Sequence, residues 1–235
     1  MPGWRLVIDK GWSHEVWHHL RMEPFALTGE RVRLAVPTLA DADVLTACLA
    51  DSSVLRWIGA MPDPYTRDDA VYFIEQVTAP GWRDETQFNW SIREKPDGWR
   101  GDDPEPPVFG GVGLTGLSSG SAEIGWWLAT AARGRGLAAE AARLVLDWAF
   151  DSETLALQRV YWRAEVGNWA SRRLAWNLGF RVEGCVRAEI VNRGERRDAW
   201  VGTLLPGDPR QPNEPWPANA PMVEPPPAVE PVETT

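Results

Sequence analysis

The segment Arg133-Gly134-Arg135-Gly136-Leu137-Ala138 contains the residue types that bind phosphate groups. It leads into a stretch with the periodicity of an amphipathic helix, and the first turn of a helix offers unpaired N–H groups and the positive end of the helix dipole. The two glycines let an anion approach closely, the two arginines add positive charge, and Ala138 keeps the start of the helix small. The segment therefore predicts a pyrophosphate-binding loop, with a tight turn carrying two solvated arginines as the alternative.

This loop and a second motif resemble the GNAT acetyltransferase superfamily. The family signature at a strand-to-helix junction is Gln/Arg-x-x-Gly-x-Gly/Ala, and Arg133, Gly136 and Ala138 match it. The run from Asn168 to Gly184 looks like the Asn-x-x-Ser…Gly-Phe-x-x-Glu-Gly signature of the branch that includes the ribosomal-protein alanine N-acetyltransferases. The resemblance covers residues 27–205 and implies an acyl-CoA-dependent N-acyltransferase that uses acetyl-CoA by default.

The resemblance also implies where the acyl-CoA binds. The strand Ala122–Leu128 would run beside the pantetheine arm, and Asn168 would hydrogen-bond that arm. The residues implied to bind the cofactor are Trp127, Leu128, Arg133, Gly134, Arg135, Gly136, Leu137, Ala138 and Asn168. A longer donor such as succinyl-CoA remains open, because the sequence offers no test of the acyl chain.

Aminolysis of a thioester requires a neutral amine, a route for its proton, a polarised carbonyl and protonation of the departing thiolate. The resemblance implies direct transfer, with Glu123 as general base and Ser171 near the sulfur as proton donor or orienting hydroxyl. Many relatives carry a tyrosine on this helix, where the chain has Ala175 and Trp176. The structural alternatives are a solvated strand carboxylate for Glu123 and a helix-interior hydroxyl bonded to backbone for Ser171.

The acceptor implied by the resemblance is a primary amine of a small molecule or a protein N-terminus. Aromatic residues of the first helices and nearby strands could bind it, because the face of an indole ring attracts an ammonium ion. The predicted substrate-binding residues are Trp57, Tyr65 and Trp90, with Arg56 beside them; core packing is the alternative for each ring. A rival function is a non-catalytic acyl-CoA-binding regulatory module, but Glu123 and Ser171 favour the enzyme.

The segment His14-Glu15-Val16-Trp17-His18 matches the zinc protease motif His-Glu-x-x-His. It lies in a short amino-terminal extension, and no histidine follows His19 to complete a three-histidine site. We therefore expect an amphipathic segment and no metal.

The segment from Gly111 to Gly116 matches the dinucleotide motif Gly-x-Gly-x-x-Gly, which requires a following helix. Leu117-Ser118-Ser119-Gly120-Ser121 predicts a turn there instead, so we interpret these glycines as strand residues in close backbone contact.

The formal charge of −9 argues against a nucleic-acid partner, which requires a basic surface. No apolar run is long enough to span a membrane, and no secretory signal is evident. The two cysteines, Cys48 and Cys185, lack metal-ligand spacing and suit a reducing compartment, so we expect a cytoplasmic protein. Homodimers are common among the family that the chain resembles.

The elements that must position these residues are readable from hydrophobic periodicity. Strands are expected at residues 32–36, 88–93, 108–117, 122–128, 159–166, 180–187 and 198–205, and helices at 38–50, from 66, from 133 to 151, and 169–177. Strands on both sides of a strand-helix-strand unit predict an α/β fold, a mixed twisted sheet of about six to seven strands flanked by helices. We expect an extension at residues 1–24, the acyltransferase domain at 25–205 and a disordered Pro/Glu-rich tail at 206–235.

Overall fold

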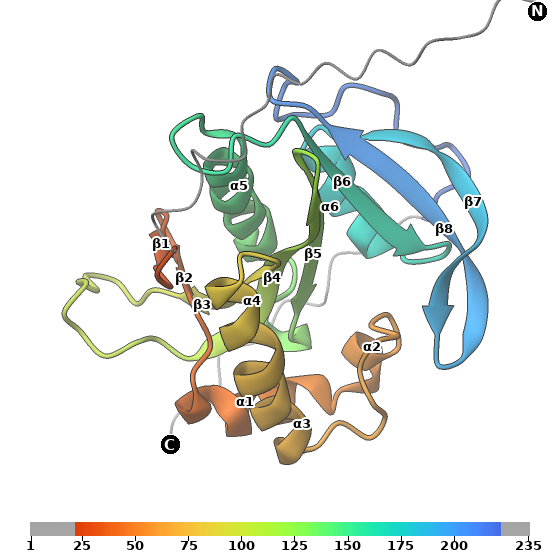
Figure 1. Ribbon diagram of the computed structural model, residues 1–235. Helices are drawn as coiled ribbons and strands as arrows, with labels where there is room; N and C mark the ends of the chain where they lie inside the picture. Colours follow the sequence, from red (N-terminus) through yellow and green to blue (C-terminus); the bar gives the residue numbers. More distant parts are fainter. Residues whose placement is uncertain (1–21, 222–235) are drawn as a thin grey trace, which may run out of the picture.

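Within residues 22–221, which the computed structural model describes, eight strands form one sheet flanked by helices (Figure 1). The strands are β1 (Leu27–Thr28), β2 (Val32–Ala35), β3 (Phe88–Glu94), β4 (Val108–Ser118), β5 (Ser121–Leu128), β6 (Arg159–Glu165), β7 (Arg181–Asn192) and β8 (Glu195–Leu204). The α-helices are α1 (Ala42–Leu49), α2 (Ser52–Leu55), α3 (Arg67–Tyr72), α4 (Ala79–Arg83), α5 (Leu137–Phe150) and α6 (Trp169–Asn177). No helix of this part of the chain is long and apolar enough to cross a membrane.

The strand order is β1-β2-β3-β4-β5-β6-β8-β7. Among the described strands, β5 and β6 are the one parallel pair, and every other neighbouring pair is antiparallel. Parallel neighbours need a long crossover connection, and α5 provides it between β5 and β6. This order produces the mixed sheet expected from the sequence.

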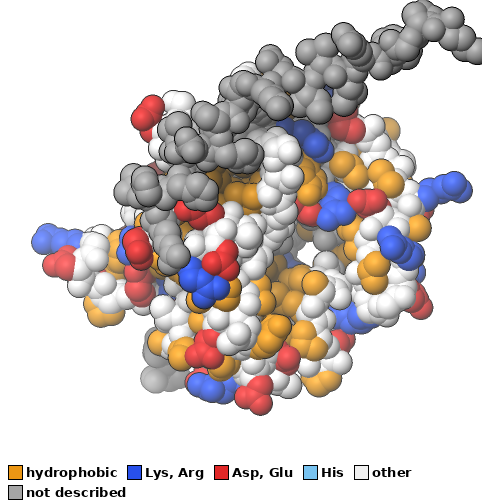
Figure 2. Space-filling view, in the orientation of Figure 1, with side chains coloured by type: hydrophobic (Ala, Val, Ile, Leu, Met, Phe, Trp, Pro, Cys, Tyr) orange, Lys and Arg blue, Asp and Glu red, His pale blue; other side chains and the backbone are white. Residues whose placement is uncertain are grey.

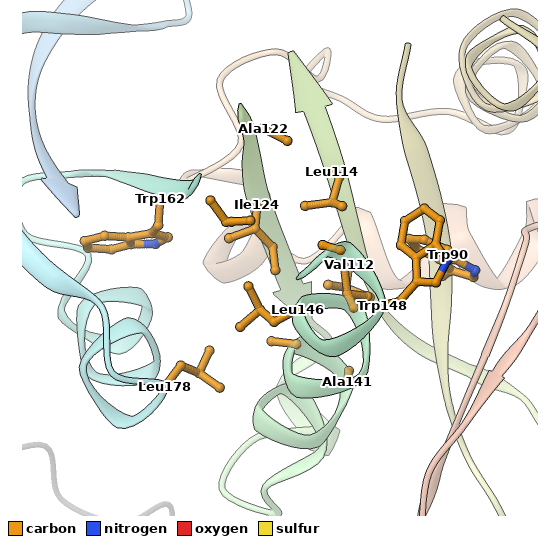
Figure 3. Packing of buried hydrophobic residues seen from close by; sticks show 14 of the residues in the cluster. Trp90, Val112, Leu114, Ala122, Ile124, Ala141, Leu146, Trp148, Trp162 and Leu178 are labelled. Atoms are coloured by element: carbon orange, nitrogen blue, oxygen red, sulfur yellow. The ribbon is translucent and has the colours of Figure 1, made fainter. Parts of the chain in front are cut away.

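The larger core cluster lies between the sheet and α5. In Figure 3, Val112 and Ile124 point from β4 and β5 toward Leu146 of α5, which is fully buried. Aromatic rings pack against one another within this cluster, mostly through edge-to-face contacts, and they belong to Phe25, Trp82, Phe88, Trp90 and Trp148. Such contacts add to the burial of these large side chains and make the core stiff at its centre.

A second cluster lies among α1, α2 and α3. It is built from small and branched apolar residues, including Leu45, Leu55 and Ile74, and it also buries Tyr65. A capping box begins α3, because the Thr66 amide donates to Asp69 Oδ2 at 2.8 Å and the Asp69 amide donates back to Thr66 Oγ1. The cap sets where α3 begins, and hence the place of Tyr65 directly before it.

A buried ion pair joins this helical layer to the sheet. Arg93 of β3 donates from Nη2 to both oxygens of Asp41 at 2.8 Å, and from Nη1 to the carbonyl of Pro106. The two side chains are only 5% and 11% exposed. Because neither group can recover water if the other is removed, the pair holds the start of α1 against β3.

The strand count exceeds the expected six to seven because of β1, which has two residues and is too short to show alternation. The other difference lies in the β7–β8 hairpin. Its strands run to Asn192 and from Glu195, so residues 188–197 extend well beyond the predicted strands. This extension reaches the α2 region, as described below.

The chain from Pro206 to Pro221 has neither helix nor strand, but it is packed against α6. Asn213 Nδ2 donates to the Gly179 carbonyl at 2.9 Å, Trp176 Nε1 donates to the Glu214 carbonyl at 2.7 Å, and the Trp216 ring lies 5.4 Å from that of Trp176. This half of the expected tail therefore differs from a solvated chain; its proline content excluded regular structure but did not reveal these contacts. Residues 222–235 and the His-Glu-x-x-His segment lie outside the described residues.

Replacing Arg93 with methionine is expected to lower the free energy of unfolding by about 3–5 kcal/mol, because Asp41 would remain buried without its partner. Urea denaturation measures the change. Arg67→Met is the matched control, since Arg67 pairs with Asp43 on the surface, with 59% and 79% of the side chains exposed, and should cost at most about 1 kcal/mol. Equal losses in the two variants would contradict this account of the buried pair.

The hydroxyl of Tyr65 is buried and has no hydrogen-bond partner in the described part of the chain. Burial, and secondarily the charge of Asp69, raises the pKa of Tyr65 to about 12 from its ordinary 10.0. Folding thus favours the neutral phenol, so its contribution to stability is complete below pH 10 and is lost between pH 10 and 12. Between pH 10 and 12 the wild-type protein should therefore lose more stability than Tyr65→Phe, as measured by the urea midpoints of the two proteins at several pH values. An equal change of the urea midpoint with pH in the two proteins would contradict this prediction.

Candidate active site

β5 and β6 separate along their length. Their pairing extends only from Ser121 with Arg159 to Glu123 with Tyr161, although β5 continues to Leu128 and β6 to Glu165. Beyond this point β5 remains bonded to β4 and β6 to β8, so a gap opens toward the carboxyl ends of both strands (Figure 1). Figure 2 shows the surface hollowed between the β5 side and the β7–β8 side. A gap at the carboxyl ends of parallel strands is a common place for a ligand.

The predicted phosphate loop lies at the open end of this gap, between β5 and α5. Gly136 is the N-cap of α5 with φ of +80°, and a Cβ at this position would meet nothing within 4 Å. The backbone N–H groups of residues 134–138 have no acceptor within residues 22–221. Five consecutive unpaired amides at a helix start, with open space in front of the N-cap, fit an anion.

The two arginines of the loop differ in their surroundings. Arg135 forms an ion pair with Glu94 of β3, and its carbonyl accepts from Arg31 Nη1 at 2.9 Å. Arg133 has no carboxylate partner within 4 Å in the described chain; it makes long contacts of 3.4 Å with the carbonyls of Leu128 and Ser53. The net positive charge of the loop therefore comes mainly from Arg133.

The second motif begins α6 on one side of the gap. Asn168 is the N-cap of α6, and its side-chain Oδ1 accepts from the backbone N–H of Ser171 at 3.2 Å. The side-chain nitrogen of Asn168, Nδ2, is left for another partner. The hydroxyl of Ser171 accepts from Trp162 Nε1 of β6 at 3.0 Å. A hydroxyl that already accepts one bond directs its own hydrogen elsewhere, so this arrangement differs from the backbone-bonded alternative considered from the sequence.

Glu123 lies on β5 at the last paired position, in an ion pair. Arg163 of β6 donates to Glu123 Oε2 at 2.6 Å and to Glu189 of β7 at 2.7 Å, and the hydrogen bond to Glu123 raises the pKa of the Arg163 guanidinium. Glu123 is 21% exposed and is therefore neither solvated nor buried. Its other oxygen, Oε1, has no hydrogen bond from a described residue, so this oxygen can still accept a proton.

A cavity of about 370 Å³ lies at the carboxyl end of β6, two residues along the strand from Arg163. Its walls come from the end of α2, the end of β6 and the tip of the β7–β8 hairpin, and they consist of Arg56, Trp57, Glu165, Asn192, Arg193, Glu195 and Arg197. The volume suits a small ligand.

The aromatic residues predicted from the sequence are distributed over different environments. Trp57 lines the cavity, with the Arg56 guanidinium 4.4 Å from the centre of its ring. Trp127 packs at the margin of the second cluster and Leu128 at that of the larger one. Tyr65 is 6% exposed in the second cluster, and Trp90 is 2% exposed in the larger core. These two rings therefore pack in the core, which was the alternative to substrate binding.

The glycines from Gly111 to Gly116 lie in β4, as interpreted from the sequence. A Cβ on Gly111 would lie 2.5 Å from Trp127 Nε1, and one on Gly113 would lie 2.8 Å from the Phe88 carbonyl. Close packing of neighbouring strands explains both. Among the described residues no group of three or more His, Cys, Asp or Glu side chains could hold a metal ion.

Several residues at this site were not predicted from the sequence: Trp162, Arg163, Glu165, Glu189 and Asn192. The charged residues at 163 and 165 alternate with buried ones along β6, a signal that one face of a central strand meets something polar. Glu189 and Asn192 lie in the extension of the β7–β8 hairpin, which was not predicted, so no strand pattern indicated that they belong to the site.

A model of the GNAT acetyltransferase domain matches residues 31–181. An uncharacterized N-acetyltransferase of Bacillus licheniformis, p20, is 28% identical over 180 residues, which span 75% of this chain and 93% of that protein. The ribosomal-protein-S5-alanine acetyltransferase of Vibrio fischeri superposes with a TM-score of 0.64 at 16% identity, covering 80% of this chain and all of that one. The microcin C7 self-immunity acetyltransferase MccE, solved in complex with acetyl-CoA and AMP, gives 0.65 at 19% identity, covering 79% and 98%. The two solved structures share the fold, and the domain match extends over more than half of the sequence. The chain belongs to the GNAT family of acetyltransferases.

Proposed function

We propose that this protein transfers an acyl group, acetyl by default, from coenzyme A directly to a primary amine. The observation that carries the proposal is the run of unpaired N–H groups at residues 134–138, placed where the gap between β5 and β6 opens. A pyrophosphate would supply the missing acceptors. The buried indole N–H of Trp126, in the part of β5 that pairs with β4 but not with β6, also lacks a partner among the described residues, which supports a polar ligand along this strand.

The residues proposed to hold the donor follow from this placement. The amides of Gly134 to Ala138 would bind the pyrophosphate, with Arg133 adding charge. Trp127, Leu128 and the free amide nitrogen of Asn168 would bind the pantetheine arm. Acetyl-CoA, when bound, supplies an activated thioester carbonyl.

In the proposed reaction the amine nitrogen attacks the thioester carbon, a C–N bond forms, and the C–S bond breaks. Glu123 takes the amine proton, directly or through a water molecule, at Oε1, because Arg163 occupies Oε2. Ser171 donates a hydrogen bond to the departing sulfur, Trp162 holds the serine oxygen in place, and the thiolate takes up a proton from solvent as CoA leaves. The acceptor amine approaches from the cavity beside Glu165.

Gly136→Val is expected to raise the dissociation constant of CoA at least about tenfold, because the side chain would fill the space needed by the pyrophosphate. Isothermal titration calorimetry measures the constant. Gly98→Val is the control, since Gly98 also has a positive φ, +76°, and open space, but lies in the loop after β3. An unchanged constant in Gly136→Val would remove the loop from the proposed binding site.

Glu123→Gln is expected to lower kcat/KM for an amine acceptor by about 100-fold, since an amide cannot accept the proton. Glu189→Gln removes the other carboxylate from the same Arg163 and should leave kcat/KM within about threefold. Thiol release with acetyl-CoA measures both. Similar losses in the two variants would mean that Glu123 only helps to position Arg163.

A further inference from the structure

The walls of the cavity beside β6 are joined by contacts between two distant segments. Asn192 Nδ2, near the hairpin tip, donates to the Arg56 carbonyl at 2.9 Å. Arg193 donates to the Leu55 carbonyl at 3.0 Å and forms an ion pair with Asp63 at 3.3 Å. The backbones also meet, because a Cβ on Gly59 would lie 2.6 Å from Asn192 Cα. Figure 1 shows the β7–β8 hairpin beside α2.

These contacts restrict the space available to the acceptor. The hairpin and the chain after α2 meet at the cavity, which leaves less room for several residues of a protein N-terminus to lie along it. The cavity volume of about 370 Å³ suits a small molecule.

Within the described part of the chain, some of the charged side chains around the cavity have an ion-pair partner and others do not. The two arginines that the hairpin contributes to the cavity wall have carboxylate partners, Arg193 with Asp63 and Arg197 with Glu195. Arg56 has none within 4 Å among the described residues; its guanidinium lies over the Trp57 ring instead. An arginine held against an aromatic face keeps its hydrogen-bonding edge for an anion.

The cavity lining also contains a carboxylate, that of Glu165, without an ion-pair partner within residues 22–221. Glu165 accepts one hydrogen bond, from Asn192 Nδ2 to Oε2 at 2.7 Å, and has no cation within 4 Å in the described chain. It follows Arg163 by two residues on the same face of β6, and so lies about 7 Å farther along the strand than Arg163. The cavity lining thus contains one carboxylate, Glu165, and one guanidinium, Arg56, that have no ion-pair partner among the described residues.

We propose that the acceptor is a small primary amine that also carries an anionic group, a carboxylate or a phosphate. Arg56 binds the anionic group, and Glu165 attracts the ammonium form of the amine before Glu123 removes its proton. This inference rests on the proposed function and names the substrate class of the same site. Arg56 and Glu165 determine specificity in it and take no part in the bond changes.

The test compares matched acceptors by thiol release from acetyl-CoA. The pairs are α-amino acids with their carboxamides and aminoalkyl phosphates with the corresponding amino alcohols; the two pairs distinguish a carboxylate from a phosphate. The anionic member of at least one pair should have a kcat/KM at least about tenfold higher. A hexapeptide with a free N-terminus should be a poorer acceptor than that member.

Arg56→Gln should reduce kcat/KM for the preferred acceptor at least about tenfold, chiefly through KM, and should lower the preference for that acceptor over its neutral counterpart. Arg159→Gln is the matched control, because Arg159 also lies over an aromatic ring, 4.9 Å from that of Tyr161, but at the far end of β6. The inference is overturned if kcat/KM is the same for both members of each pair, or if it is highest for the hexapeptide. Either result leaves the proposed function intact. CoA binding without turnover of any amine overturns the proposed function itself.

Discussion

Hydrogen bonding between β5 and β6 stops after Glu123 and Tyr161, and the arrangement of the site follows from that position. Each strand keeps an antiparallel partner on its other side, β4 along β5 and β8 along β6, so the two halves of the sheet remain well bonded while they separate. α5 must return the chain from the end of β5 to the start of β6, which places its unpaired N-terminal amides at the wide end of the gap. One constraint therefore sets both the opening and the anion-binding loop beside it.

The positive charge of the loop is smaller than its two arginines suggest. Glu94 neutralises Arg135, so the backbone amides of residues 134–138 and Arg133 remain to attract an anion. Amides fixed by the start of a helix need no rearrangement when the anion arrives, whereas a solvated arginine must lose conformational freedom. This explains why the left-handed backbone at Gly136 matters more to the proposed binding than the number of cations.

On the other face of the gap, charge pairing joins the separated strands. Arg163 connects Glu123 of β5 with Glu189 of β7 and spans the point where direct strand pairing ends. The same contacts fix one oxygen of Glu123 and leave the other, so a group that stabilises the sheet can also serve as the proposed base. Trp162, on the opposite face of β6, holds the hydroxyl of Ser171 through one hydrogen bond.

The sequence by itself predicted the seven longer strands, without the extension of β7 and β8 over residues 188–197, and it predicted the crossover helix and the two motifs that carry the family resemblance. Each of these depends on local periodicity or on residues close in the chain. It did not distinguish Trp90 in the core from Trp57 at the cavity, since burial of an indole depends on what packs against it. Only the tertiary structure decided that Arg163 engages Glu123 and that the hairpin tip meets α2, contacts that span 40 and more than 130 residues. Such contacts arise from strand order and hairpin length, and neither leaves a local pattern in the residues that meet.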